Sequence, residues 1–248
     1  MALSSSCGGS VEKPVELIKA EPSIGIGILE VSLNRDIPLY RDFDSAEPFD
    51  RLGFSEVEEG NDKGKFLIDT TDSLDLKPFK YYPGDSEDET NANISRGLTY
   101  VVPKLIFKVL EQKGETYCVV LNEETFETAV IKRDRSWILY LKGEEPYWWT
   151  QHFKAPEGTA WLLYETWEEY LSRVIFVSLN PSIKVYDSPG GKEISKDPIR
   201  AGRVTEMSGN WMKLGERMYD TPESAKTGWV RWTDGVQLLV RPVAEVYR

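Results

Sequence analysis

Apolar and polar residues alternate through residues 31–40 (VSLNRDIPLY) in the pattern of two short strands. An alternation with a period of two residues is typical of a strand that buries one of its faces. The polar residues at positions 34–36 separate the two pieces and favour a turn. The apolar positions are Val31, Leu33, Ile37 and Leu39. We therefore predict two strand pieces around a turn, preceded by an apolar stretch whose two glycines weaken strand propensity.

The same pattern returns at residues 177–186 (VSLNPSIKVY), where six of the ten positions are identical. Three further pairs of stretches match, and they follow in the same order in both halves of the chain. The pairs are residues 109–111 with 204–206, residues 114–121 with 209–214, and residues 128–132 with 227–231. Matches that keep their order indicate two copies of one structural unit.

The two copies differ in length at one place. The first copy takes 69 residues from Tyr40 to Val109, whereas the second takes 18 from Tyr186 to Val204. The first copy therefore carries an insertion, at about residues 45–98, that is rich in carboxylates. Insertions of this length are commonly functional or disordered, and we expect a solvated, partly mobile excursion. Its candidate anchors are the apolar stretches at residues 66–68 and 79–82.

An aromatic-rich connector at residues 143–173 joins the two copies. The apolar stretch at residues 137–141, just before it, has the pattern of a strand. Residues 166–173 (TWEEYLSR) predict a short helix, with Thr166 as the N-cap and acidic residues in the first turn.

Composition narrows the range of partners. The chain has 248 residues, 40% of them hydrophobic, and a net charge of −11, with a pI of about 4.8. That apolar content suffices for real cores. An acidic surface repels phosphate backbones and anionic membranes, so the charge argues against nucleic-acid binding. No stretch reaches the roughly 18 apolar residues that a membrane-spanning helix needs.

The first 23 residues lack periodicity, and we predict a flexible leader there. Within this leader, residues 3–7 (LSSSC) resemble the end of a bacterial lipoprotein signal, which makes Cys7 a candidate lipidation site. The apolar core of such a signal is missing from the sequence. Two interpretations therefore stay open: a lipoprotein whose signal has been clipped, and a disordered leader that carries no lipid.

The residues that usually carry catalysis or bind metals are sparse. His152 is the single histidine, so no Ser-His-Asp triad can be argued, and no metal-ligand spacing or phosphate-binding glycine loop occurs. The acidic residues at 85–89 lack the spacing of a calcium loop and fit a solvated loop better. Cys118 lies in an apolar run and is interpreted as a small core residue. We predict no catalytic residue, no metal and no cofactor.

The aromatic residues are the strongest indication of a binding function. Tyr147, Trp148 and Trp149 follow one another directly. Neighbours in a strand point to opposite sides, so at least one ring faces outward unless a second layer covers it. Exposed rings can hold sugars or peptides, whereas buried rings would fill a seam between two domains. Both interpretations stay open here, and the same two apply to Trp232.

The second copy contains four short motifs in a recognisable order. They are residues 183–186 (IKVY), 188–190 (SPG), 209–211 (GNW) and 227–230 (TGWV). Over roughly residues 174–240 this pattern resembles the bacterial SH3-like domains of cell-envelope proteins. The first copy departs from the pattern, with Ala129 and Val130 where the glycine and tryptophan would stand, and it shares the resemblance through the internal repeat. Gly228 is expected to allow a close approach to a neighbouring segment.

The resemblance implies an all-β fold of two SH3-like small β-barrels in tandem. The expected divisions are a leader at 1–23, a barrel at 24–142, the aromatic connector at 143–173 and a second barrel at 174–248. Small barrels need close-spaced turns and a few large core side chains, which this sequence supplies.

The resemblance also implies a non-enzymatic binding module of the bacterial cell envelope, periplasmic or on the cell surface, that recognises cell-wall peptide or glycan. Another envelope protein is an alternative partner. The expected ligand-binding residues are Tyr186, Trp211, Trp229, Trp232, Trp148 and Trp149. The alternative function is a structural or protein-interaction scaffold whose aromatic rings are all internal and whose acidic loop meets a protein partner.

Overall fold

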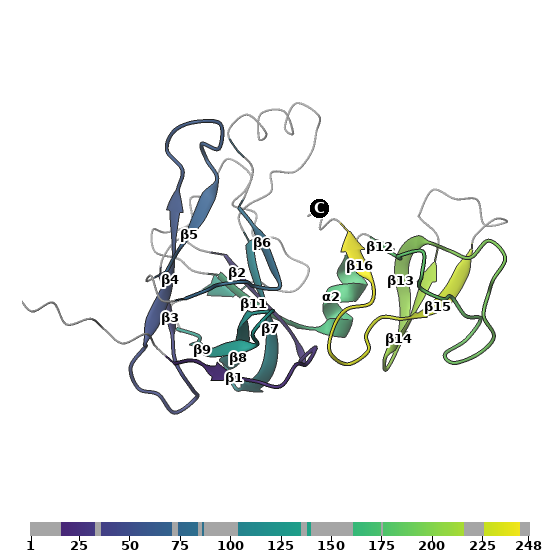
Figure 1. The fold of residues 1–248 in the computed structure, drawn as a ribbon, viewed down its shortest axis with the longest axis horizontal. Helices are drawn as coiled ribbons and strands as arrows, with labels where there is room; N and C mark the ends of the chain where they lie inside the picture. Colours follow the sequence, from purple (N-terminus) through teal and green to yellow (C-terminus); the bar gives the residue numbers. More distant parts are fainter. Residues whose placement is uncertain are drawn as a thin grey trace, which may run out of the picture.

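The structure is a computed structural model. It describes residues 16–32, 36–70, 74–83, 86, 104–134, 138–139, 161–174, 176–215 and 226–243. Over these residues the protein is mainly β-sheet, as predicted, with a short helix between two larger sheets (Figure 1). Cys7, Trp148, Trp149, His152 and most of residues 85–89 lie outside the described residues.

The larger sheet belongs to the N-terminal half. Its strands follow the order β1-β9-β8-β7-β2-β11-β10, with β6 pairing on β7 as a further strand. All its pairs are antiparallel except that of β10 with β11. The strands are β1 (Ile18–Lys19), β2 (Gly27–Ser32), β6 (Lys80–Tyr82), β7 (Lys104–Lys113), β8 (Thr116–Asn122), β9 (Glu127–Lys132), β10 (Ile138–Leu139) and β11 (Trp161–Thr166).

The smaller, five-stranded sheet belongs to the C-terminal half. It follows the order β15-β14-β13-β12-β16, and every pair is antiparallel. Its strands are β12 (Phe176–Ser178), β13 (Ala201–Ser208), β14 (Trp211–Gly215), β15 (Thr227–Arg231) and β16 (Arg241–Val243). The predicted close approach at Gly228 is confirmed: a Cβ atom at this position would overlap Cγ1 of Val185 in a neighbouring segment.

The internal repeat of the sequence is matched by a repeat of strand pairing. The series β2-β7-β8-β9 corresponds to β12-β13-β14-β15, and in each half a later strand, β11 or β16, pairs antiparallel with the free side of the first. The register shifts between Val109 and Glu111 in one copy and between Val204 and Glu206 in the other. The two copies thus share strand order, and both carry an irregularity at aligned positions.

A tyrosine closes each copy in the same way. Tyr40 forms an antiparallel bridge with Val130 in β9, and Tyr186 forms one with Trp229 in β15. Each tyrosine follows the first strand of its copy, while its bridge partner lies in the strand at the far end of the series. The chain therefore brings the two ends of each four-strand series towards each other.

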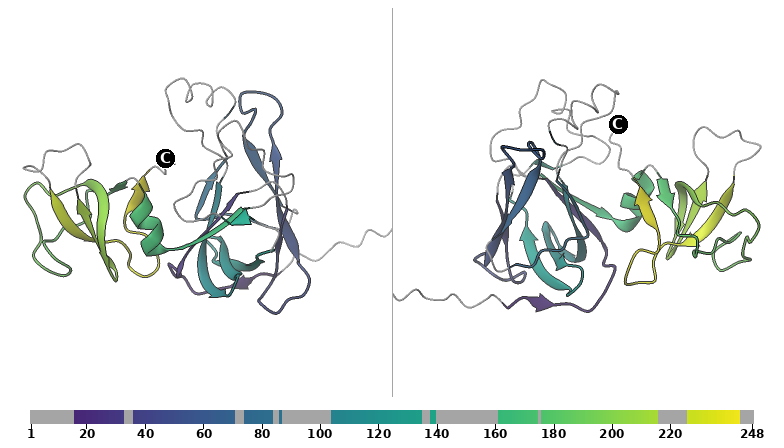
Figure 2. Two further views of the ribbon diagram at one scale, coloured as in Figure 1. Left: turned by 180° about the vertical axis from the view of Figure 1, so that it is seen from behind. Right: turned by 45° about the horizontal axis from the view of Figure 1, so that its top comes forward.

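Part of the insertion forms regular structure that the sequence analysis missed. Strands β4 (Asp50–Glu56) and β5 (Phe66–Thr70) belong to the insertion, and they join β3 (Ile37–Leu39), the second of the two predicted strand pieces, in a three-stranded antiparallel sheet. Leu52 in β4 is fully buried, and Ile68, in the predicted anchor at residues 66–68, packs on the core of the N-terminal half. Two further views show the β4–β5 hairpin on the side of the N-terminal half away from the C-terminal sheet (Figure 2). The predicted anchor at residues 79–82 is confirmed, because β6 pairs with β7 and Phe79 packs on buried apolar residues.

Helix α2 (Trp167–Arg173) begins where the sequence predicts. The Thr166 side chain accepts a hydrogen bond from the Glu169 backbone, and the Glu169 carboxylate accepts one from the Thr166 backbone N–H in return. This reciprocal pair satisfies two backbone donors that a helix start leaves open.

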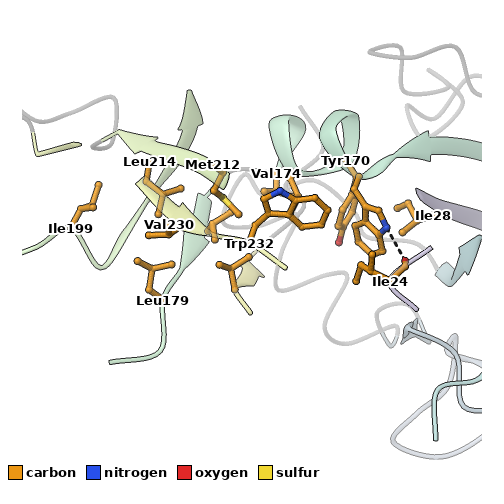
Figure 3. Close-up of a cluster of buried hydrophobic side chains, with 14 of the residues drawn as sticks. Ile24, Ile28, Tyr170, Val174, Leu179, Ile199, Met212, Leu214, Val230 and Trp232 are labelled. Atoms are coloured by element: carbon orange, nitrogen blue, oxygen red, sulfur yellow. Dashed lines mark hydrogen bonds between the residues drawn. The ribbon is translucent and has the colours of Figure 1, made fainter. Parts of the chain in front are cut away.

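Two apolar cores lie on opposite faces of strands β2 and β7. Leu29 and Phe107 point into a core confined to the N-terminal half. Ile28 and Ile106 point the other way, into a second core that continues through α2 and into the C-terminal sheet. Figure 3 shows this second core as a row of side chains that runs from Ile28 to Ile199. The two halves are thus joined by shared packing.

Candidate functional site

One face of the C-terminal sheet gathers aromatic and cationic side chains. In β14 and β15, Met212, Leu214 and Val230 point into the second core, so the residues between them point to the opposite side. Cross-strand pairing puts Trp211 opposite Arg231 and Lys213 opposite Trp229. Tyr186 joins the same side through its bridge with Trp229. We name this surface the aromatic face; it consists of Tyr186, Trp211, Lys213, Trp229 and Arg231.

Two rings of the aromatic face touch each other and remain partly open to solvent. The Tyr186 and Trp211 ring centroids lie 5.3 Å apart with an interplanar angle of 89°. Both side chains are half-buried, whereas Trp229 is 7% exposed. Tyr186 and Trp211 therefore supply the accessible aromatic surface, and Trp229 is the buried aromatic member of this face.

The turn after Tyr186 is held by its own hydrogen bonds. The Asp187 carboxylate accepts from the Lys192 backbone N–H at 2.9 Å and from the Ser188 hydroxyl at 3.0 Å. The Gly191 N–H donates to the Ser188 carbonyl at 2.9 Å. Backbone bonds of Tyr186 with Trp229, both 2.8 Å, fix the other side. The position of Tyr186 is therefore set by the backbone on two sides.

Trp232 does not lie on the aromatic face. It is 7% exposed, belongs to the second core and lies 6.1 Å from Trp167, centroid to centroid. Its indole N–H donates to the Gly209 carbonyl at 2.8 Å and so anchors the β13–β14 turn. The grouping of Trp232 with the exposed aromatic residues is thus corrected: a buried indole with a satisfied N–H fills the core. The predicted Trp148 and Trp149 lie outside the described residues.

The first copy carries a different surface on the equivalent strands. Thr116, Cys118 and Val130 occupy the places of Trp211, Lys213 and Trp229. Tyr40 has no aromatic partner among the ring contacts of the described residues; instead the Lys132 ammonium lies 4.4 Å from its ring centroid. Cys118 is half-buried, and burial raises the pKa of its thiol. One scaffold thus carries two surfaces, of which only the second is rich in aromatic rings.

Sequence reasoning missed Lys213 and Arg231. The signal was available, since both lie at two-residue spacing from tryptophans already singled out, Trp211 and Trp229. Two-residue spacing in a strand places side chains on the same face. The two-residue spacing therefore predicts that Lys213 and Arg231 share a face with the tryptophans.

A buried ionic cluster lies where α2 meets the N-terminal sheet. Arg173 Nε donates to both Glu165 oxygens, at 2.8 and 2.7 Å, and its Nη2 lies 3.3 Å from a Glu30 oxygen. The two glutamate side chains are 5% and 2% exposed. Burial raises the pKa of Glu165, and the Arg173 guanidinium opposes that rise. This cluster holds α2 against β2.

A second buried pair lies on the same face of the N-terminal sheet. Lys108 Nζ lies 2.5 Å from a Glu123 oxygen, and the lysine side chain is 4% exposed. Burial raises the pKa of Glu123, against the opposing effect of Lys108. Such pairs hold segments in place when both partners are present.

Within the described ranges, no group of three or more His, Cys, Asp and Glu side chains is placed to hold a metal ion. No helix in that part of the chain is both long and apolar enough to cross a membrane. Comparisons with protein-family models, curated proteins and solved structures found no match to this chain.

Proposed function

We propose that the protein is a non-enzymatic binding protein of the bacterial cell envelope that holds cell-wall peptide or glycan on its aromatic face. The observation that carries the proposal is the partly exposed pair of Tyr186 and Trp211, flanked by Lys213 and Arg231 on one side of a sheet. Accessible tyrosine and tryptophan rings with nearby hydrogen-bond donors are typical of binding surfaces. The motifs of the second copy favour the same assignment.

We also propose that each copy is an SH3-like small β-barrel. The repeated strand order and the tyrosine bridges between the two ends of each series support this. The barrels would be those expected from the sequence, at 24–142 and 174–248, with two corrections to the other divisions. The expected leader to residue 23 includes β1, which pairs with β9, and the expected connector at 143–173 includes β11, which pairs with β2. An envelope location with lipid on Cys7 belongs to the same proposal and is tested by mass spectrometry of the mature protein.

The direct test is co-sedimentation of the full chain with purified cell wall. We expect wild type to pellet with the wall, and Trp211→Ala to reduce the bound fraction about tenfold, since truncating a central ring at an interface costs about 1–2 kcal/mol or more. Leu67→Ala is the matched control, because it removes a large apolar side chain that is 58% exposed on β5, outside the aromatic face.

If wild type stays wholly in the supernatant, the proposed function is wrong. If Trp211→Ala and Leu67→Ala bind alike, the wall is bound at a place other than the aromatic face.

A second candidate function, a scaffold with internal aromatic residues, is favoured by the burial of Trp167, Trp229 and Trp232, each at most 7% exposed. Acrylamide quenching separates the two functions. We expect Trp211→Phe to lower the quenchable share of tryptophan emission, whereas Trp232→Phe leaves that share unchanged or raises it. Equal quenching of wild type and Trp211→Phe would favour the scaffold.

A further inference from the structure

We infer that the aromatic face takes a peptide that carries a free carboxylate, in preference to a glycan. The inference rests on the proposed function and narrows its ligand class. Its first support is the charge of the chain. Residues 176–248 contain 11 Lys and Arg against 9 Asp and Glu, whereas the preceding residues contain 19 against 32. The aromatic face therefore belongs to a part of the acidic chain that carries no net negative charge.

The second support is the position of the cations. Arg231 is exposed, points to the same side as Trp211, and has no ion pair within the described residues. Lys213 Nζ lies 3.9 Å from a Glu206 oxygen, at the limit of an ion pair. A guanidinium offers two parallel N–H groups that match a carboxylate, and a nearby ammonium adds attraction without a fixed geometry. A neutral sugar would leave Arg231 without a counter-charge.

The third support is the arrangement of the rings. Because Tyr186 and Trp211 stand nearly perpendicular, at 89°, they present a corner between a ring face and a ring edge. A corner suits an apolar side chain that contacts both rings, whereas a sugar stacks best on a single open ring face. A short peptide can place a side chain in this corner and a carboxylate on Arg231 at the same time.

The first copy serves as an internal comparison. Its counterpart of Arg231 is Lys132, which donates to the Ser45 carbonyl at 2.5 Å and lies over the Tyr40 ring. The counterpart of Lys213 is Cys118, which has no charge to offer an anion at neutral pH. The equivalent cation is thus used within the fold in the first copy and is open in the second, which assigns the carboxylate site to the second copy alone.

The test compares peptide and glycan fractions of one purified cell wall, separated after cleavage of the bond between them. Binding of each fraction to the full chain is measured by titration calorimetry, before and after the carboxylates of both fractions, including those set free by the cleavage, are converted to amides. We expect the untreated peptides to bind and amidation to weaken binding about tenfold, the loss typical of one charge-assisted pair. Arg231→Gln should lose a similar factor for untreated peptides and little for amidated ones. Arg241→Gln, an exposed arginine on β16, is the control.

The outcomes distinguish this inference from the proposed function. Binding of the glycan fraction alone, or equal binding of amidated and untreated peptides, overturns the carboxylate site and leaves the cell-wall function standing. Failure of both fractions and of intact wall to bind overturns the proposed function itself. Equal affinity of Arg231→Gln and Arg241→Gln for untreated peptides also overturns the inference, because the preference would then have another source.

Discussion

Replacing Arg173 with methionine is expected to lower the free energy of unfolding by about 3–5 kcal/mol, the usual loss when one partner of a buried ion pair is removed. The guanidinium is the charge partner of two nearly buried carboxylates, Glu165 and Glu30. Methionine keeps much of the side-chain length but removes the positive charge that both glutamates face. The loss is measured by urea denaturation at pH 7.5, where an unpaired carboxylate is ionised unless its pKa has risen far.

The same variant should show a distinctive dependence on pH. Burial already raises the pKa of Glu165 above the ordinary 4.5, and Arg173 opposes that rise. Without Arg173 the pKa rises further, so between the unfolded and the folded pKa the native state binds more protons than the unfolded state. Stability then falls as pH rises through that window. We expect the loss of unfolding free energy in Arg173→Met, relative to wild type, to be largest at neutral pH and to shrink towards pH 5.

Two further variants identify the cause. Arg51→Met removes an exposed arginine whose partner, Asp36, is also exposed, so it should cost less than about 1 kcal/mol. The double variant Glu165→Gln/Arg173→Met should recover part of the stability, because an amide costs less to bury than an unpaired carboxylate. A pH-independent deficit in Arg173→Met, or no recovery in the double variant, would mean that lost packing outweighs lost charge.

The strands of the repeated scaffold were predictable from sequence because strand formation depends on local patterns, and the repeat indicated that both halves use them in the same order. Each of the signals acts over only a few residues: the alternation at residues 31–40 and 177–186, the aligned Gly114 and Gly209, and the capping signal at Thr166. The β4–β5 hairpin was missed because its sequence is dominated by carboxylates near the turn, and burial of Leu52 depends on Ile37 and Thr70 across the sheet. Tertiary pairing of this kind overrides local polarity.

The candidate site was predictable only in part, for a similar reason. Tyr186, Trp211 and Trp229 come together because the bridge and the β14–β15 register place them on one face. Trp232 follows Arg231 directly, and the next position along the strand should point back towards the core, which the motif-based grouping ignored. Its burial against Trp167 depends on α2, a packing partner more than 60 residues earlier in the chain.

Trp167 connects the two halves of the protein. Its ring contacts Phe79 at 5.5 Å on the N-terminal side and Trp232 at 6.1 Å on the C-terminal side, centroid to centroid. Its indole N–H donates to the Ile24 carbonyl at 2.9 Å (Figure 3). The Ile24 N–H in turn donates to the Gly235 carbonyl at 2.9 Å. One side chain therefore supports packing and hydrogen bonding across the junction.

Trp167→Ala is expected to lower the free energy of unfolding by about 3–5 kcal/mol, as for other large buried aromatic residues. Because each half keeps its own sheet, the variant should also separate their unfolding. Far-UV circular dichroism and tryptophan emission are expected to follow one coincident urea transition in wild type and two displaced transitions in the variant.

Trp167→Phe keeps a ring but loses the hydrogen bond to Ile24, and should lower the free energy of unfolding by less than Trp167→Ala does. Trp211→Ala, on the half-exposed aromatic face, should keep the transitions coincident. A single coincident transition in Trp167→Ala would mean that the shared core does not couple the halves through this ring.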